Sequence, residues 1–129
     1  MLKKPVWLHK KIGLSDCQRL EAFIRGERLH TVCQQAHCPN RGECFSKGEA
    51  TFLILGNTCT RKCSFCRVEK NGLPQAPDRE EPRRLAQAIR QLGLAHVVIT
   101  SVTRDDLSDG GAGHFAASVS CIRSYCPGI

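Results

Sequence analysis

Long hydrophobic runs and aromatic side chains are both scarce in this sequence. It contains no stretch of about 18 apolar residues, which excludes a membrane-spanning helix. Aromatic residues make up 5% of the chain, whereas proteins that bind single-stranded nucleic acid usually stack the bases on aromatic rings. Residues 1–11 mix lysines with a short apolar segment that is too interrupted for a secretory signal. The sequence therefore predicts no membrane span and disfavours a nucleic-acid partner.

Cysteine, by contrast, is abundant. The chain has 9 cysteines in 129 residues, and a protein without a secretory signal is kept under reducing conditions in which thiols stay free. Thiolates are soft ligands that suit iron or zinc, so metal binding is favoured over disulfides. We expect a cytoplasmic protein of a bacterium, or a mitochondrial or plastid protein whose transit peptide has been removed.

The chain is also basic. It has 19 Lys and Arg against 12 Asp and Glu, which gives a formal net charge of +7. The basic residues are scattered without a long run, which is typical of an ordinary solvated surface. The same charge also suits an acidic protein partner.

Two apolar segments have the pattern of buried strands. They are residues 51–55 and residues 96–100. Between them, Pro82 suits the start of a helix, an apolar face follows it, and Gly93 ends it. Strand, helix and strand make one βαβ unit, so the two strands should be parallel. A further helix should begin near Gly113, and the predicted fold class is α/β.

The segment before these strands is expected to be irregular. Ser15 to Gln18 has the pattern of a capping box, so a short helix should begin at Ser15 and run to about Arg25. Residues 33–44 read as a loop wrapped around a metal, because they contain three residues that favour turns, Pro39, Asn40 and Gly42.

Cys59, Cys63 and Cys66 follow the first predicted strand with the spacing C-x3-C-x2-C. Three thiolates at this spacing can hold three irons of a four-iron cluster and leave the fourth iron open to a small molecule. Structural zinc usually takes four protein ligands in paired C-x2-C knuckles, which this triplet lacks. The loop leaves the carboxyl end of a strand, where parallel α/β proteins place their chemistry.

A second triplet lies upstream, with the spacing C-x4-C-x5-C, and consists of Cys33, Cys38 and Cys44. It is also one ligand short of a closed four-ligand site. On its spacing alone, zinc competes with an iron–sulfur cluster. The remaining cysteines match neither pattern and read as buried or idle thiols: Cys17, Cys121 and Cys126.

The downstream triplet resembles that of the radical S-adenosylmethionine (SAM) enzymes. Both triplets in this order, followed by ITSVTRDDL at 99–107 and DGGA at 109–112, closely resemble the lipoyl synthases. The resemblance implies the N-terminal part of a partial (β/α)6 TIM-like barrel in residues 45–129. A loop-rich, cysteine-containing extension precedes it in residues 1–44. Because such barrel enzymes are about twice this length or more, we expect an incomplete copy that is inactive alone.

The same resemblance implies two 4Fe–4S clusters and SAM as cofactors. The triplet of Cys59, Cys63 and Cys66 would hold the SAM-cleaving cluster, and that of Cys33, Cys38 and Cys44 an auxiliary cluster. The family closes the auxiliary site with a serine from a later part of the chain. The residues expected at SAM are an aromatic ring beside the adenine and an acidic, glycine-rich turn: Phe65, Asp105, Asp106, Asp109, Gly110 and Gly111. No catalytic side chain beyond the cluster ligands is implied.

The implied activity is that of lipoyl synthase, a sulfurtransferase. An electron from the downstream cluster cleaves SAM, and the resulting 5'-deoxyadenosyl radical removes hydrogen from carbon 6 or carbon 8 of a protein-bound octanoyl-lysine. The auxiliary cluster donates the two sulfur atoms. The implied partners are octanoylated lipoyl domains of 2-oxo acid dehydrogenase E2 subunits, the glycine cleavage H protein, and an electron donor such as flavodoxin or ferredoxin. Nucleic acid and membrane are not among them.

Two alternatives stay open at this point. One is another radical SAM enzyme with an auxiliary cluster, although the x4 then x5 spacing favours lipoyl synthase. The other is a zinc-binding nucleic-acid or interaction module. An iron–sulfur absorption band would exclude that zinc module.

Overall fold

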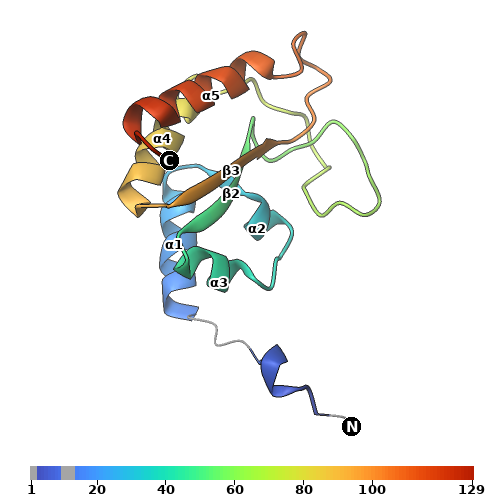
Figure 1. Ribbon diagram of the computed structural model, residues 1–129. Coiled ribbons are helices and arrows are strands. Elements are labelled where there is room, and N and C mark those ends of the chain that lie inside the picture. Colours follow the sequence, from blue (N-terminus) through green and yellow to red (C-terminus); the bar gives the residue numbers. More distant parts are fainter. Residues whose placement is uncertain (1–2, 10–13) are drawn as a thin grey trace.

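A three-stranded sheet lies at the centre of the computed structural model, which describes residues 3–9 and 14–129 (Figure 1). Its strands, in spatial order, are β1 (His30–Thr31), β2 (Glu49–Ile54) and β3 (His96–Ser101). β1 runs antiparallel to β2, whereas β2 and β3 are parallel. The sheet is therefore mixed, with β2 as the central strand.

The helices pack around this sheet (Figure 1). Two long helices, α4 and α5, pack against each other, and α1 packs against α3. The short helices α2 and α3 both contact β2. The helical elements, in chain order, are η1 (Val6–Leu8), α1 (Leu14–Gly26), α2 (Val32–Gln35), α3 (Arg41–Ser46), α4 (Glu81–Leu92) and α5 (Ala112–Tyr125).

The predicted βαβ unit is confirmed. Pro82 lies in the first turn of α4, where its missing N–H costs nothing. Gly93 ends the helix in the left-handed conformation at φ 60°, which glycine adopts without strain. β2 and β3 then align in parallel from Glu49 opposite His96 to Ile54 opposite Ser101. This unit is the building block of a parallel α/β barrel, so the predicted α/β class is confirmed.

The hydrophobic core lies between β2 and α4. Phe52 and Ile54 of β2 are fully buried, and so are Leu85 and Ile89 of α4, which lie four residues apart on one helical face. β2 is buried on both faces because it is the central strand. Burying each of these side chains contributes about 2 kcal/mol to stability.

β3 differs from the sequence prediction, which made it a second fully buried strand. Its side chains alternate instead: Val97 and Ile99 pack against the core, whereas His96 and Val98 are exposed. The reason is its place in the sheet, since β3 is an edge strand of the described residues and has a core on one face only.

The N-terminal part is more regular than predicted. The expected metal loop at 33–44 contains most of α2 and most of α3, with a turn between them. The predicted capping box is also misplaced, because α1 begins at Leu14 and Ser15 already lies inside its first turn. The side chain of Asp16 and residues 10–13 lie outside the described residues. Across residues 3–9 and 14–129, no helix combines the length and the apolar character needed to cross a membrane.

Candidate metal and cofactor site

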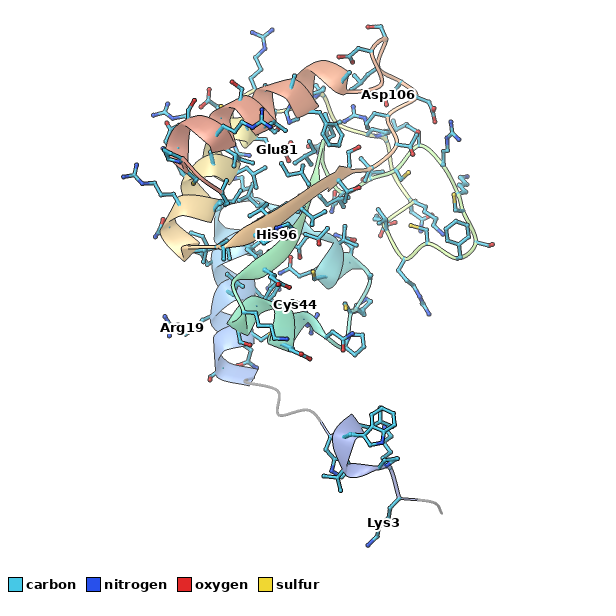
Figure 2. All side chains as sticks on the ribbon, in the orientation of Figure 1. Lys3, Arg19, Cys44, Glu81, His96 and Asp106 are labelled. Carbon is cyan, nitrogen blue, oxygen red and sulfur yellow. The ribbon has the colours of Figure 1, made fainter. Side chains whose placement is uncertain are left out.

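The downstream cysteine loop leaves the sheet at the carboxyl end of β2. Leu55 and Gly56 both have positive φ angles, 68° and 88°, and so turn the chain out of the strand. Positive φ is unfavourable for leucine. The conformation is stabilised by a buried hydrogen bond from the Leu55 N–H to Oε2 of Glu81, at 3.0 Å. Glu81 also lies 2.6 Å from His114 Nε2, so this buried carboxylate joins β2, α4 and α5 (Figure 2).

Cys59, Cys63 and Cys66 all lie on this one loop. Its base is closed by a hydrogen bond from the Cys59 N–H to the carbonyl of Glu69, at 3.1 Å. In a tight turn, the Cys66 N–H donates to the Cys63 carbonyl at 3.2 Å. Cys63 is exposed, whereas Cys59 and Cys66 are half-buried. The three thiols are thus presented on an accessible loop beyond the sheet.

Cys59 has the surroundings of a thiolate. Its Sγ accepts hydrogen bonds from the backbone N–H of Thr103, at 3.3 Å, and of Arg61, at 3.5 Å. Burial by itself raises the pKa of the Cys59 thiol, but these N–H donors outweigh burial and leave the pKa below its usual value. A thiolate is the form that binds a metal, and N–H donors to a ligand sulfur tune a bound cluster.

The acidic residues after β3 already have partners, and those of Asp105 lie on the cysteine loop. Asp105 accepts two hydrogen bonds from the Arg61 guanidinium, both at 3.1 Å, and lies 2.7 Å from the Thr60 hydroxyl. Hydrogen bonds from Arg61 and Thr60 lower the pKa of the Asp105 carboxyl. Asp106 is held by Arg104, which is 3% exposed, in a bidentate pair at 2.8 and 2.9 Å. The loop after β3 is thus a network of internal contacts.

Arg104 connects three segments of the chain. Besides Asp106, its guanidinium donates to the Leu55 carbonyl at 3.0 Å and to the Gln75 carbonyl at 2.7 Å. The first carbonyl ends β2 and the second belongs to the connection that leads to α4. Figure 2 shows Asp106 at the outer end of this arrangement, on the loop that leaves β3.

Asp109, Gly110 and Gly111 form the turn that starts α5. The Asp109 carboxylate accepts hydrogen bonds from the N–H groups of Gly111 and Gly113, both at 2.9 Å, and these bonds lower its pKa. Gly111 has φ 95°, and a Cβ there would lie 2.3 Å from Leu55 Cδ1. Its lack of a side chain is therefore required by packing against Leu55.

The upstream triplet lies on separate elements. Cys33 belongs to α2 and Cys38 to the turn after it. Cys44 belongs to α3, where Figure 2 labels it. Burial raises the pKa of the Cys33 thiol, a backbone hydrogen bond from Thr51 opposes this, and the nearby Cys38 and Cys44 thiols add to the rise. Cys33 thus lies beside β2 and within electrostatic range of both Cys38 and Cys44. His37 lies in the same turn and is exposed.

The thiols in both triplets are uncommitted. In the described part of the chain all cysteines are free, and no three His, Cys, Asp or Glu side chains converge closely enough to hold a single metal ion. A four-iron cluster sets a different requirement, because each thiolate binds a separate iron. Each segment offers three free thiols, one for each of three irons. Cys59 in addition has two N–H donors on its sulfur. Both segments therefore fit a four-iron cluster.

An open cleft of about 660 Å³ lies between the two cysteine segments. It is bordered by the turn that holds Cys38 and by the loop that holds Cys66. The polar side chains along it come from both segments and from α1, and include Arg25, Arg28, Gln34, Gln35, His37, Arg41, Arg67 and Glu69. Residues next to Cys38 and Cys66 therefore border one shared, mainly basic space, which none of the described cysteines lines directly.

Sequence reasoning missed several residues of this site. Thr60, Arg61 and Thr103 hold the cysteine loop, and Glu81 supports it from below. No sequence pattern indicates that residues 59–61 contact residues 103–105, more than forty positions away. The usable signal was the parallel alignment of the two strands, because loops that leave neighbouring parallel strands at the same edge of a sheet must meet.

Comparisons with known proteins agree with this arrangement. Residues 53–123, more than half of the chain, match the Radical SAM superfamily. The match begins within β2 and ends within α5, so it contains the downstream cysteine loop and the loop after β3.

Similar curated proteins are named lipoyl synthase. The one from Trichlorobacter lovleyi is 58% identical over 126 residues, which cover 98% of this chain and 45% of that protein. The one from Caldanaerobacter subterraneus subsp. tengcongensis is 57% identical over 128 residues, covering 99% and 44%. That from Geobacter metallireducens is 58% identical over 127 residues, covering 98% and 44%. The chain thus spans less than half the length of these relatives.

The family match and the site coincide. The loop that carries Cys59, Cys63 and Cys66 lies inside the matched segment, at the carboxyl end of a parallel strand. The chain belongs to the radical SAM superfamily.

Proposed function

We propose that this chain provides the two cluster-binding segments and the first parallel strands of a lipoyl synthase. The observation that carries the proposal is the pair of cysteine triplets, C-x4-C-x5-C and then C-x3-C-x2-C, in a chain 57–58% identical to proteins of that name over nearly its whole length. The reaction would insert two sulfur atoms into a protein-bound octanoyl-lysine. Inserting sulfur at an unactivated C–H bond needs a cofactor, because ordinary side chains cannot perform it.

Cys59, Cys63 and Cys66 would hold a 4Fe–4S cluster with one open iron. When bound, this cluster supplies the electron that cleaves SAM. The chain contributes the thiolates, the two N–H donors to Cys59 Sγ and the hydrogen bond that closes the loop at Glu69. These contacts fix the loop, and the N–H donors favour the thiolate form of Cys59.

Cys33, Cys38 and Cys44 would hold the auxiliary cluster, the source of sulfur. The electrostatic interaction of Cys33 with Cys38 and Cys44, and the cleft between residues next to Cys38 and Cys66, support this role. Arg123–Tyr125 has a faint likeness to the serine motif that completes the family's site. It lies in the last turn of α5, so we assign it no ligand role.

We propose contacts with SAM for the aromatic ring on the cysteine loop and for the glycine-rich turn before α5. Phe65 is 88% exposed on the cysteine loop, so its ring is free to pack on the adenine. Asp105, Asp106 and Asp109 have carboxylates engaged by Arg61, Arg104 and backbone N–H groups. Gly110 and Gly111 offer backbone that a ligand can approach closely. Phe65 is therefore the best supported SAM contact among these residues.

The partners would be octanoylated lipoyl domains, of 2-oxo acid dehydrogenase E2 subunits or of the glycine cleavage H protein. The basic cleft supports an acidic partner, because Arg25, Arg28 and Arg67 border it, while Arg41 is paired there with Glu21. An electron donor such as flavodoxin or ferredoxin would reduce the downstream cluster.

A chimera tests the proposal. Residues 1–129 are joined to the C-terminal part of the Trichlorobacter lovleyi protein that the chain does not cover, and the product is reconstituted anaerobically with iron and sulfide. With SAM and a reductant, it should cleave SAM and add two sulfur atoms to an octanoylated lipoyl domain, measured by mass spectrometry. The isolated 129-residue chain should not complete this reaction.

Cysteine variants of the chimera separate the two triplets. Cys33→Ser should still cleave SAM but insert no sulfur, and Cys59→Ser should do neither. Cys121→Ser, outside both triplets, is the control and should leave both activities unchanged. SAM cleavage without sulfur insertion by the unmodified chimera, when the whole Trichlorobacter lovleyi protein is active, would point to another radical SAM reaction. Tight zinc without iron would support the zinc-binding module.

A further inference from the structure

Two loops far apart in sequence are joined beside Cys59. Residues 59–61 of the cysteine loop contact residues 103–105 after β3 through a set of hydrogen bonds. The Thr60 N–H donates to the Thr103 carbonyl at 3.1 Å, and the Asp105 N–H donates to the Thr60 hydroxyl at 3.3 Å. The Thr103 N–H in turn donates to Cys59 Sγ. The same few residues thus fix both the loop and the sulfur.

Asp105 is the centre of this contact. Both its carboxylate oxygens accept from the Arg61 guanidinium in a fork, and Oδ2 also lies 2.7 Å from the Thr60 hydroxyl. Such a bidentate pair fixes orientation as well as distance. The hydroxyl proton of Thr60 serves either Asp105 or the Thr103 carbonyl, 2.9 Å away, and its oxygen accepts from the Asp105 N–H. The carboxylate is committed to the cysteine loop.

The exposure of this ion pair argues against a role in overall stability. The side chains of Arg61 and Asp105 are 63% and 52% exposed. Ion pairs with that much solvent contact contribute little to folding, because water screens them. What the pair does fix is the local geometry of two loops that are otherwise exposed to solvent.

We propose that Asp105 is a positioning residue that, through Arg61 and Thr60, holds the Cys59 loop against the loop after β3 and keeps the Thr103 N–H on the Cys59 sulfur. In this role the Asp105 carboxylate does not contact SAM directly, in contrast to the expectation from the sequence. It rests on the proposed function in one respect, that Cys59 is a cluster ligand. Its immediate structural consequence is independent of any cofactor.

That consequence is measured by hydrogen exchange on the metal-free, reduced 129-residue chain. Asp105→Asn and Arg61→Gln should each raise amide exchange several-fold in two separate peptides, one spanning residues 57–63 and one spanning residues 102–106. The double variant should exchange no faster than Asp105→Asn alone, since Arg61 acts on this contact through Asp105. Thr60→Val tests the hydroxyl from the same loop if Asp105→Asn does not fold.

Two matched controls lie close by. Lys62→Gln removes the same charge as Arg61→Gln at the neighbouring position. Glu80→Gln removes an exposed carboxylate next to buried Glu81. Both should exchange like the unmodified chain. Unchanged exchange in Asp105→Asn, or an equal rise in Lys62→Gln, would overturn the proposal.

A second measurement separates positioning from ligand contact. In the reconstituted chain, Asp105→Asn and Arg61→Gln should shift the EPR g values of the reduced cluster alike, while SAM affinity stays within about twofold of the unmodified chain. A large loss of SAM affinity in Asp105→Asn alone, with exchange unchanged, would make Asp105 a SAM ligand and overturn the proposal. A chain that holds no cluster would contradict the proposed function, whereas the exchange result would still decide whether Asp105 holds the loops together.

Discussion

The backbone N–H of Thr103 donates to Sγ of Cys59 over 3.3 Å, although the two residues lie 44 positions apart in the chain. The parallel alignment of β2 and β3 produces this contact, because Ile54 and Ser101 end their strands side by side. The loops that follow must then leave the sheet at the same edge. A thiol from one loop and an N–H from the next are thereby brought together without any local sequence signal.

Gly111 should be far less tolerant of a side chain than its neighbour Gly110. Both have positive φ, 95° and 61°, but only at Gly111 would a Cβ collide with Leu55 Cδ1, at 2.3 Å. Gly111→Ala should cost about 3 kcal/mol of unfolding free energy through strain and overpacking. Gly110→Ala has open space and should cost about 1 kcal/mol from backbone strain alone. Urea unfolding measures both, and equal losses would contradict the close contact with Leu55.

Arg104 should matter more for stability than its carboxylate partner. Arg104→Met leaves the carbonyls of Leu55 and Gln75 without their donor, so it should lower the unfolding free energy by about 3 kcal/mol. Asp106→Asn removes only the charge of the more exposed partner of Arg104, and it should change the urea midpoint of unfolding little. If Asp106→Asn destabilises the chain as much as Arg104→Met, the ion pair and not the carbonyl contacts holds the loops.

His30 should make the chain less stable in mild acid. Burial lowers the pKa of His30 in the folded chain, and the negative charge of Glu81 opposes this only in part. The unfolded chain therefore binds the proton more readily, and the stability that the neutral ring contributes is complete above about pH 6.5 and lost as the pH falls below it.

Unfolding between about pH 5 and pH 8 checks this behaviour. His30→Gln should flatten the loss of stability on the acid side. His96→Gln, at an exposed position in β3, should follow the unmodified chain and is the control. An acid loss of the same size in all three proteins would show that His30 is not responsible.

The two cysteine triplets should bind iron independently. Cys33→Ser should reduce the iron of the reconstituted chain by about four atoms and keep the SAM-dependent EPR change, because the downstream cluster remains. Cys63→Ser should also reduce the iron content by about four atoms, and it should abolish the SAM-dependent EPR change. Cys17→Ser, at a buried thiol on α1, controls for the loss of a cysteine as such. Loss of all iron in either triplet variant would contradict independent sites.

Most of the parallel unit was predictable from local patterns. The apolar run at 51–55, Pro82 at a helix start and Gly93 in a left-handed cap each reflect a property of one short segment. β3 was predicted with the wrong burial, because a strand's neighbours in the sheet decide how many of its faces are covered. The pairing of His30–Thr31 with β2 was not predicted, since two residues give no periodicity.

The upstream segment shows a signal that was present and overlooked. The Thr31 hydroxyl accepts from the Gln34 N–H at 3.2 Å and caps α2, and Thr31 to Gln34 has the spacing of a capping box. Turn residues at 39–42 suggested a continuous loop instead. In the candidate site, the cysteines were identified from their spacing, whereas the partners of Asp105 and Asp106 follow from tertiary contacts that only the folded chain reveals.

The most direct test of the account is the iron and sulfide content of the anaerobically reconstituted chain, combined with EPR of the reduced protein before and after SAM is added. We predict about eight irons per chain, four for each triplet, and a change in the reduced signal when SAM binds the open iron. A chain that takes up no iron, or whose reduced signal is the same with and without SAM, would contradict the central claim that the Cys59 loop holds a SAM-binding cluster.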